Sequence, residues 1–284
     1  MKKIAEVLFL ISCLNSSCVP APEYTAIPAY LYTPSATTDN NTPTIEPIEQ
    51  ANSHLPLKAT WQIQYTDEID LTLNVDIYNL DLFDTDSAVI SQLHERGIFV
   101  MCYFSAGSFE DWRPDIHNFP AEILGKDYEG WQGEKWLDIR KMDLLEPVMS
   151  ARLDLASQKG CDGVDPDNVN GFANDTGFPL SYEDQLQYNI WLAESAHARG
   201  LLIGLKNDPE QIPDLLPYFD WHLHEQCFQY NECEMLLPFI QAGKPVFNIE
   251  YTLAPSDFCT QSNEIGFNSI RKNMILDIFI ETCK

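Results

Sequence analysis

The stretch GCDGVDPDN, residues 160–168, decides the fold expected for this chain. Its apolar part is short and leads into two carboxylates two residues apart, Asp165 and Asp167. Small and β-branched residues inside a sheet, followed by reactive groups where the strand ends, are typical of a strand in an α/β barrel. We therefore predict a buried strand here, with candidate site residues at its carboxyl end.

Other strand-like runs lie before and after this stretch, and segments with helical spacing separate most of them. The runs cover residues 60–65, 76–83, 98–104, 201–207, 221–226 and 244–251, and residues 265–280 could add a weak eighth strand and a closing helix. Helices are expected over 87–96, 144–159, 181–199, 211–218 and 234–241, and the helix from Ser181 has a capping acid at Asp184.

Alternation of strands with helices requires a parallel sheet with crossover connections. Seven strands and a weak eighth predict an α/β fold of the (β/α)8 TIM-barrel type, as a single domain over residues 57–284. A doubly wound open sheet is the alternative. No GxGxxG or P-loop pattern stands where a nucleotide would need it, and we expect no cofactor.

The N-terminal part of the chain has the composition of an export signal followed by a tether. Residues 1–18 form a leader with a basic start and a short apolar stretch, and LISC at 10–13 resembles a lipoprotein cleavage box. Lipidation at Cys13, lipidation at Cys18 and simple secretion all remain open. Residues 19–56 are rich in Pro and Thr and are expected to be a disordered linker. We predict a secreted or cell-surface bacterial protein, in contact with a membrane only through such a lipid anchor.

The chain is strongly acidic, with 43 acidic and 17 basic residues and a net charge of −26. Phosphate binding needs clustered Lys and Arg, so a nucleic-acid partner is not expected. An acidic field attracts a cationic substrate, although the charge could also serve solubility alone.

Eight cysteines indicate an oxidising compartment. Cys102 and Cys161 stand in apolar strand contexts and are expected to be inert thiols of the core. Two other pairs are candidates for disulfides, namely Cys227 with Cys233 and Cys259 with Cys283.

Polar groups follow four of the predicted strands. The carboxyl ends of barrel strands share one rim, so these groups should converge there. Several carboxylates without a metal-ligand pattern suit glycoside cleavage, which needs a carboxylic acid and a carboxylate. His222 and His224 lack a third ligand at fixed spacing, so no metal site is expected. The candidates are Asp165, Asp167, Asn168, Lys206, Asn207, Glu225 and Glu250.

Each of these residues also has a structural alternative. Asp165 could be a turn or N-cap acid before Pro166, and Asp167 and Asn168 could cap the next segment. Glu225 could pair with Lys206 or Arg140, and Glu250 could belong to a buried ion pair. Asp162, in the same strand as Asp165, is expected to make a structural hydrogen bond. Aromatic rings near strand ends could stack on sugars, although aromatics fill cores routinely. The aromatic candidates for substrate binding are Tyr65, Tyr103, Trp112 and Trp136.

Six motifs in order give the chain a family resemblance: YFSAGSFEDWRPD, GWQGEKWLDIR, KGCDGVDPDNVNG, GLKND, EQCFQYNEC and NIEY. Over about residues 61–283 the chain closely resembles glycoside hydrolase family 114, the endo-α-1,4-polygalactosaminidase-like TIM-barrel proteins. The resemblance implies hydrolysis of α-1,4 linkages in galactosamine polymers, whose free amines are cationic.

The resemblance also implies a catalytic pair, Asp167 in DPDN and Glu225 in HEQC. By analogy with other barrel α-glycosidases, Asp167 would be the nucleophile and Glu225 the acid/base, with retention of configuration. Many family members have EPDN where this chain has DPDN, so the role of Asp165 is open. A non-catalytic carbohydrate-binding barrel and a glycosidase for another polysaccharide are the rival interpretations.

Overall fold

The computed structural model describes residues 55–283 of the chain. These residues belong to one compact unit that spans Gln50–Lys284. The predicted leader, with Cys13 and Cys18, lies outside the described residues, as does the linker apart from residues 55 and 56. Leu55 packs into an interior cluster of the domain, so the packed structure includes residues at the end of the predicted linker.

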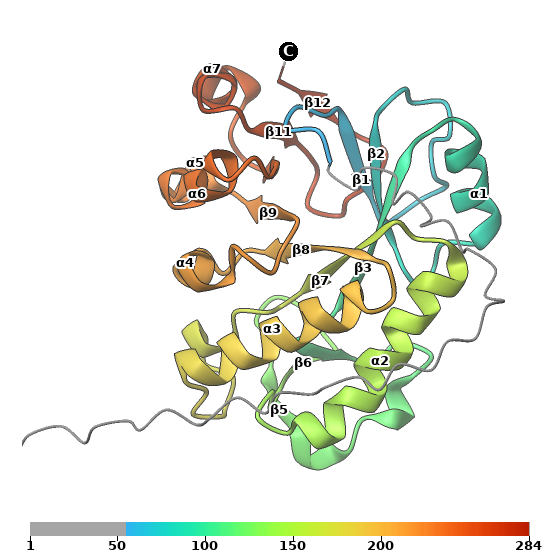
Figure 1. Cartoon of the computed structure of the whole chain (residues 1–284), viewed down its shortest axis with the longest axis vertical. Helices are drawn as coiled ribbons and strands as arrows, with labels where there is room; N and C mark the ends of the chain where they lie inside the picture. Colours follow the sequence, from blue (N-terminus) through green and yellow to red (C-terminus); the bar gives the residue numbers. More distant parts are fainter. Residues whose placement is uncertain (1–54, 284) are drawn as a thin grey trace, which may run out of the picture. The chain divides into compact units, whose positions relative to one another are not determined.

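A curled sheet of eight parallel strands in chain order forms the centre of the domain, and a ninth, antiparallel strand follows the eighth (Figure 1). The parallel strands are β1 (Trp61–Gln64), β2 (Ile77–Asp81), β3 (Phe99–Ser105), β7 (Gly163–Asp167), β8 (Leu202–Lys206), β9 (Trp221–Glu225), β10 (Val246–Glu250) and β11 (Asn268–Arg271), and the antiparallel strand is β12 (Glu281–Thr282).

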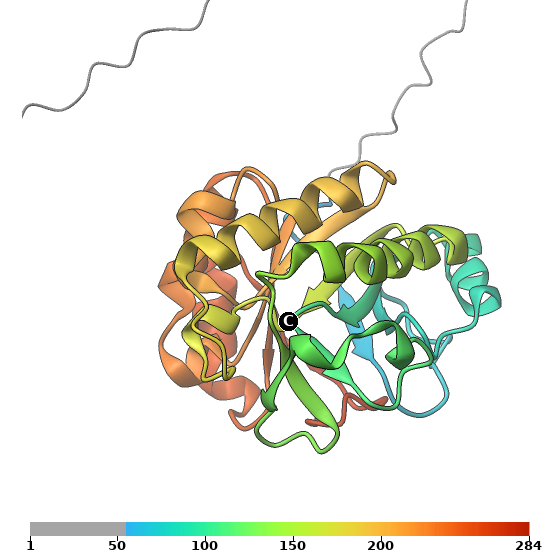
Figure 2. The same cartoon turned by 90° about the horizontal axis from the view of Figure 1, so that it is seen from below.

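The helices lie on the outer side of this sheet, and Figures 1 and 2 show α2 and α3 side by side there. The capping box predicted at Ser181 and Asp184 is present at the start of α3. The helices are α1 (Ser87–Glu95), α2 (Met142–Lys159), α3 (Tyr182–His197), α4 (Ile212–Leu215), α5 (Cys227–Tyr230), α6 (Leu237–Gln241) and α7 (Pro255–Ile265). Short 3-10 turns are η1 (Ile116–Asn118), η2 (Ala121–Ile123), η3 (Gly171–Ala173), η4 (Pro209–Gln211) and η5 (Cys233–Leu236).

The barrel prediction is confirmed as a curled parallel α/β sheet, but not as a strict (β/α)8 barrel. Within residues 55–283, no helix lies between β1 and β2, and no backbone ladder joins β1 to β11. Side chains bridge that seam instead: Trp61 Nε1 donates to the carbonyl of Asn268 at 2.9 Å.

The prediction of a closing helix at the end of residues 265–280 is wrong, because no helix follows β11 within residues 55–283. After β11 the chain crosses back over β1, where Lys272 Nζ donates to Gln62 Oε1 at 2.8 Å and to the carbonyl of Asp277 at 2.7 Å. These bonds hold the segment in an irregular path that ends in β12.

An antiparallel sheet of three strands stands between β3 and α2, where the sequence suggested a polar loop. Its strands are β4 (Ser108–Glu110), β5 (Leu124–Asp127) and β6 (Glu134–Leu137), in the order β4-β6-β5. It adjoins the carboxyl end of β3, because Leu137 N–H donates to the carbonyl of Gly107 at 3.0 Å.

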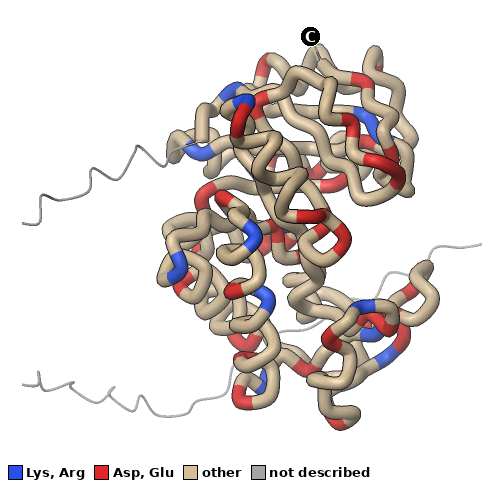
Figure 3. Tube along the Cα trace, turned by 90° about the vertical axis from the view of Figure 1, so that its right-hand side faces the viewer, with Lys and Arg blue, Asp and Glu red and all other residues tan. Residues whose placement is uncertain are grey.

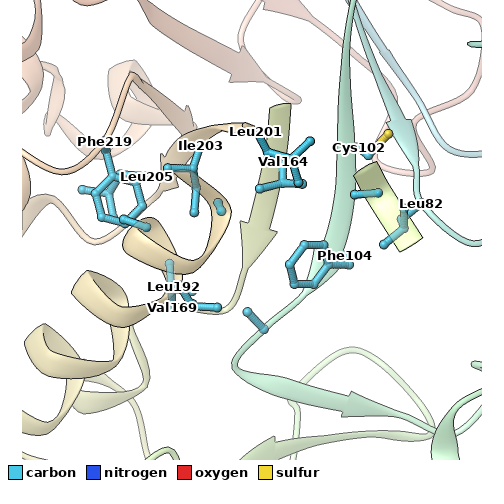
Figure 4. Close-up of a cluster of buried hydrophobic side chains, with 14 of the residues drawn as sticks. Leu82, Cys102, Phe104, Val164, Val169, Leu192, Leu201, Ile203, Leu205 and Phe219 are labelled. Atoms are coloured by element: carbon cyan, nitrogen blue, oxygen red, sulfur yellow. The ribbon is translucent and has the colours of Figure 1, made fainter. Parts of the chain in front are cut away.

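Apolar side chains form one cluster between the sheet and the helices and another inside the curl. Figure 4 shows part of the outer cluster, where Phe104, Val164 and Leu205 lie on the strands and Leu192 on α3. Strand residues point alternately to the two sides, so both faces of the sheet are buried, as expected for parallel strands.

Three disulfides join the six cysteines of the described region. The predicted bonds Cys227–Cys233 and Cys259–Cys283 are both present. The prediction of inert thiols at Cys102 and Cys161 is wrong, because these residues form the third disulfide. Pairing of β3 with β7 brings the Cα atoms of Cys102 and Cys161 to 6.0 Å from each other, although 59 residues separate them in sequence.

The interior of the curl depends on two glycines that face one indole ring. A Cβ atom on Gly204 would stand 2.0 Å from Trp221 Nε1, and one on Gly163 would stand 2.7 Å from the same ring. Trp221 is fully buried, so the ring has no free space into which it could move.

We therefore expect Gly204→Ala to lower the free energy of unfolding by about 1–3 kcal/mol, as overpacked cores do. Thermal unfolding of the two single variants and of Gly204→Ala with Trp221→Phe gives a double-mutant cycle. The double variant should lose less stability than the sum of the single variants, because the smaller ring makes room for the methyl group. Strict additivity would contradict this account.

Candidate active site

A cavity of about 560 Å³ opens at the carboxyl ends of the strands. Residues in β2, β3, β7, β8 and β9 and residues directly after β1 and β10 contribute to its wall, together with the β4–β6 sheet and the segment after β11. It gathers eight residues predicted from the sequence: Tyr65, Tyr103, Trp112, Asp167, Asn168, Lys206, Asn207 and Glu225.

The ammonium group of Lys206 lies between the two predicted catalytic carboxylates. Lys206 Nζ is 3.3 Å from Asp167 Oδ1 and 3.4 Å from Glu225 Oε2. The three residues end the neighbouring strands β7, β8 and β9, so strand pairing brings them together. The side chain of Lys206 is only 3% exposed, so the two carboxylates provide the charge compensation that a buried cation needs.

The pKa values of this group follow from burial and from the mutual attraction of its charges. Burial alone would lower the pKa of Lys206, but the charges of Asp167, Glu225 and Asp165 outweigh it and raise that pKa above its usual value. Burial would raise the pKa of Glu225, but the Lys206 cation and hydrogen bonds lower it. Lys206 is therefore charged and Glu225 ionised near neutral pH.

Glu225 is held in place by neighbours on both sides. The hydroxyl of Tyr251 donates to its Oε1, and Asn207 Nδ2 donates to its Oε2 at 3.2 Å. Asn207 Oδ1 in turn accepts the backbone N–H of Glu225 at 3.0 Å. One asparagine thus fixes both the backbone and the carboxylate of this residue.

Asp167 is fixed by the turn that follows β3. Its carbonyl accepts the backbone N–H groups of Ala106 at 2.9 Å and Gly107 at 3.1 Å. A Cβ atom on Gly107 would stand 1.7 Å from the carbonyl oxygen of Asn168, so this close approach requires glycine.

Residues directly after three of the strands adopt left-handed backbone conformations. Asn168 has φ of 62°, Asn207 of 52° and Gln226 of 63°, and each lines the cavity. Non-glycine residues in this region of φ are uncommon and occur often at functional sites. Here the conformation turns each chain sharply where a charged side chain must face the cavity.

Two tyrosines whose rings are tilted by 33° against each other form one side of the cavity. The rings of Tyr65 and Tyr103 lie 4.5 Å apart between centroids, and Lys206 Nζ lies 5.9 Å from the Tyr103 centroid. The Tyr65 hydroxyl donates to Asn79 Oδ1 at 3.0 Å, and Asn79 Nδ2 donates to Asp165 Oδ2 at 2.8 Å. Asp165 therefore supports this wall from beneath.

With this geometry established, comparisons with known proteins identify the family. The sequence matches glycoside-hydrolase family GH114 over residues 42–284. The chain belongs to glycoside-hydrolase family GH114. It is a glycoside hydrolase, as the six motifs predicted.

Two solved structures and one further protein are similar to this chain. Aspergillus fumigatus Ega3, solved in complex with galactosamine, is 41% identical, with a TM-score of 0.78 over 81% of this chain and 97% of that one. The glycoside hydrolase domain of Pseudomonas aeruginosa PelA is 15% identical, with a TM-score of 0.63 over 78% of this chain and 98% of that one, and shows a similar fold. An uncharacterized protein of Deinococcus radiodurans is 24% identical over 89% of each chain.

Three predicted site residues of this GH114 enzyme do not line the cavity. Glu250 is the last residue of β10 and points outward from the curl, where its Oε1 accepts the N–H of Phe228 at 3.0 Å. Trp136 is buried against the ring of Tyr128. Asp165 lies under the cavity, where burial outweighs the effects of Lys206 and Asn79 and raises its pKa to about 6.

Asp162, His222 and His224 lie outside the cavity. Asp162 makes the expected structural hydrogen bond, from the backbone N–H of Val100 at 2.8 Å. His222 and His224 point away from the cavity, and His224 Nε2 lies 3.1 Å from Glu232 Oε2. Among residues 55–283, no three His, Cys, Asp or Glu side chains are grouped so that they could hold a metal ion.

Several cavity residues were not singled out from the sequence. Glu134 and Tyr128 come from the antiparallel insert, and Arg113 forms a buried cluster with Asp81 and Glu110. The motif GWQGEKWLDIR contains Glu134, but nothing in its spacing indicates which residue faces the cavity. Trp131, in the same motif, also lines the cavity and is 51% exposed.

We expect Lys206→Met to raise the pKa of Glu225, because burial then acts without the cation that opposes it. Loss of one partner of a buried ion pair should cost about 3–5 kcal/mol at neutral pH. A folded-state pKa below the unfolded value stabilises the protein above that unfolded pKa and is lost as pH falls. The stability difference from the parent should therefore shrink in acid.

Chemical denaturation across pH, together with a carbon-13 NMR titration of Glu225, measures both effects. Lys206→Arg is the matched control, because it keeps the charge. An unchanged Glu225 pKa in Lys206→Met would contradict the assigned role of this cation.

Proposed function

We propose that this protein hydrolyses α-1,4 linkages within a galactosamine-containing polysaccharide. The observation that carries the proposal is the carboxylate pair bridged by Lys206 inside the cavity of a GH114 enzyme. Ega3, which is 41% identical, was solved with galactosamine bound, and this supports an aminosugar as the unit recognised here.

In this proposal Asp167 is the nucleophile and Glu225 the acid/base. Asp167 attacks the anomeric carbon while Glu225 gives its proton to the leaving oxygen, and a glycosyl ester forms on Asp167. Glu225 then takes a proton from water, which attacks the same carbon and releases the sugar. Two inversions retain the α configuration, and both carboxyl groups return to their starting states.

The distances to Lys206 support retention. Because Asp167 Oδ1 and Glu225 Oε2 both lie within 3.4 Å of one nitrogen, they are less than about 7 Å apart. Retaining enzymes have carboxyl groups about 5–5.5 Å apart, whereas inverting enzymes need about 6.5–9.5 Å to admit a water molecule. Glu225 must also acquire a proton before it can act, and its lowered pKa makes acidic conditions favourable for that step.

The aromatic wall supports action on a polymer. Trp112 is 48% exposed and Trp131 51% exposed, and both line the cavity, so their faces are available to sugar rings. The open cavity wall around these rings favours binding of a chain that extends beyond one sugar, as an endo-acting enzyme requires.

We also propose that the protein works outside the cytoplasm. The three disulfides within residues 55–283 support an oxidising compartment. In residues 55–283, no helix has the length and apolar character needed to cross a bilayer. Lipid attachment at Cys13 or Cys18 remains a prediction.

Substitution of each carboxylate tests the assigned roles. We expect Asp167→Asn and Glu225→Gln each to slow release of oligosaccharides from partly de-N-acetylated α-1,4-galactosaminan by about 10²–10⁴-fold while remaining folded. NMR of the first product should show the α anomer. A β anomer formed first would contradict retention.

Azide with an activated aryl α-galactosaminide distinguishes the two roles in alanine variants. With Asp167→Ala, azide should replace the nucleophile and give the β-glycosyl azide. With Glu225→Ala, it should replace water in the second step and give the α-glycosyl azide. The opposite pattern would exchange the roles of the two residues.

Salt dependence tests whether the charge steers the substrate. Acidic positions outnumber basic ones along the described chain (Figure 3), in keeping with the net charge of −26. Raising ionic strength from about 0.01 M to about 1 M should lower kcat/KM for the cationic polymer by about tenfold. A fully N-acetylated, uncharged fragment is the control substrate, and an equal effect on both would contradict steering.

A further inference from the structure

We propose that Glu134 selects the free 2-ammonium group of the sugar bound in the cavity. The inference rests on the proposed function and adds to it the residue that distinguishes galactosamine from N-acetylgalactosamine. It follows from how the carboxylates of the cavity are paired with cations.

Arg113 neutralises the first pair of cavity acids. Its guanidinium is 2.8 Å from Asp81 Oδ2 and 2.8 Å from Glu110 Oε2, and it donates to both oxygens of Glu110. Asp84, at the mouth, lies 3.6 Å from the same guanidinium and its side chain is 76% exposed. None of these three carboxylates is both buried and without a cation.

Lys206 neutralises the second pair, Asp167 and Glu225, as described above. Every oxygen of Glu225 is engaged, by Tyr251, Asn207 and Lys206. Glu225 therefore has little capacity left to bind a second cation without losing Lys206.

Glu134 differs from all of these acids. It is 6% exposed and lines the cavity, yet no Lys, Arg or His of the described region forms an ion pair with it. Its Oε1 accepts from Ser108 Oγ and, at 2.9 Å, from Asn168 Nδ2. Its Oε2 accepts no hydrogen bond within residues 55–283 and is not sealed in the interior.

The position of Glu134 places this oxygen beside the reacting sugar. Asn168, which binds Glu134, is the next residue after Asp167, and it also donates to Ser105 Oγ at 3.0 Å and Ser108 Oγ at 2.9 Å. This network fixes Glu134 relative to the nucleophile. A sugar whose anomeric carbon faces Asp167 carries its amino nitrogen on the adjacent ring carbon, two bonds from the anomeric carbon.

The chemistry of the C2 substituent suits an unpaired carboxylate. An ammonium group offers three hydrogen-bond donors and the positive charge with which Glu134 is not otherwise paired. It would therefore form a charge-assisted hydrogen bond with this carboxylate in a partly desolvated site. An acetamido group offers one N–H and no charge, and it places a carbonyl oxygen near the carboxylate. The cavity should therefore favour the free amine.

The electrostatics of Glu134 agree with this role. Burial, aided by the charge of Asp167 and opposed by the hydrogen bond from Ser108, raises the pKa of Glu134 to about 7. A bound ammonium would favour the ionised form and lower this pKa. Affinity for the aminosugar should then decline as pH falls below 7, because binding has to displace a proton.

The experiment measures Glu134→Gln in the full chain. Glutamine keeps the oxygen that accepts from Asn168 and Ser108 and removes only the charge. Glu95→Gln, an exposed residue in α1 away from the cavity, is the control for loss of one negative charge. KM and kcat are measured on galactosaminans of low and high N-acetylation, and inhibition by free galactosamine and N-acetylgalactosamine is compared.

We expect Glu134→Gln to raise KM for the de-N-acetylated polymer about tenfold, with a much smaller change in kcat, because one charge-assisted contact is lost. Inhibition by galactosamine should weaken by a similar factor and lose its pH dependence near 7, whereas inhibition by N-acetylgalactosamine should not weaken. Glu95→Gln should behave as the parent.

Three results would overturn the proposal. One is an unchanged preference for the free amine in Glu134→Gln. Another is an equal loss on both polymers through kcat alone, which would mean that Glu134 only positions Asn168. The third is equal inhibition of the parent by the two monosaccharides. If the parent cleaves no galactosaminan but its tryptophan fluorescence still reports galactosamine binding lost in Glu134→Gln, the proposed function fails and the Glu134 site stands.

Discussion

The active site depends on one buried cation. A lysine ammonium removed from water is costly unless opposite charges compensate it. Lys206 gains that compensation only where β7, β8 and β9 end side by side, because Asp167 and Glu225 come from the strands on either side of it. The requirement links the geometry of the site to sheet register, since a slip of one residue would turn these side chains to the opposite face.

The residues that directly follow the strands orient the carboxylate side chains that the register brings together. Asn168 and Asn207 have left-handed backbone conformations. The side chain of Asn168 donates to Glu134 beside Asp167, and the side chain of Asn207 forms hydrogen bonds with Glu225. Asparagine tolerates this conformation better than most residues and offers both a donor and an acceptor. The same two residues thus end the strands and hold the carboxylates, so backbone strain and site geometry have one cause.

The sequence reveals which strands carry the site but not every face or long-range contact. Strand ends predicted Asp167, Lys206 and Glu225, because parallel strands share one rim. Glu250 was misplaced because the end of β10 presents it and Tyr251 to opposite sides, and the pattern NIEY does not say which side is inward. Glu134 stands in an insert without clear periodicity, and the disulfide partners of β3 and β7 lie 59 residues apart. Such contacts exist only once the chain has folded.

The distribution of cations, more than the net charge, determines what the cavity acids can do. Beside Lys206, the pKa of Glu225 is lowered although desolvation disfavours the charged form, so this side chain is held as an ion. Glu134 has no such cation, and burial moves its pKa to about 7. Two glutamates of one cavity are thus given different protonation behaviour by their neighbours, as pairs of carboxylates in active sites often are. In the role proposed for Glu134, an ammonium ligand would reverse only the second shift, so a cavity that already holds Lys206 and Arg113 would still bind a cationic sugar.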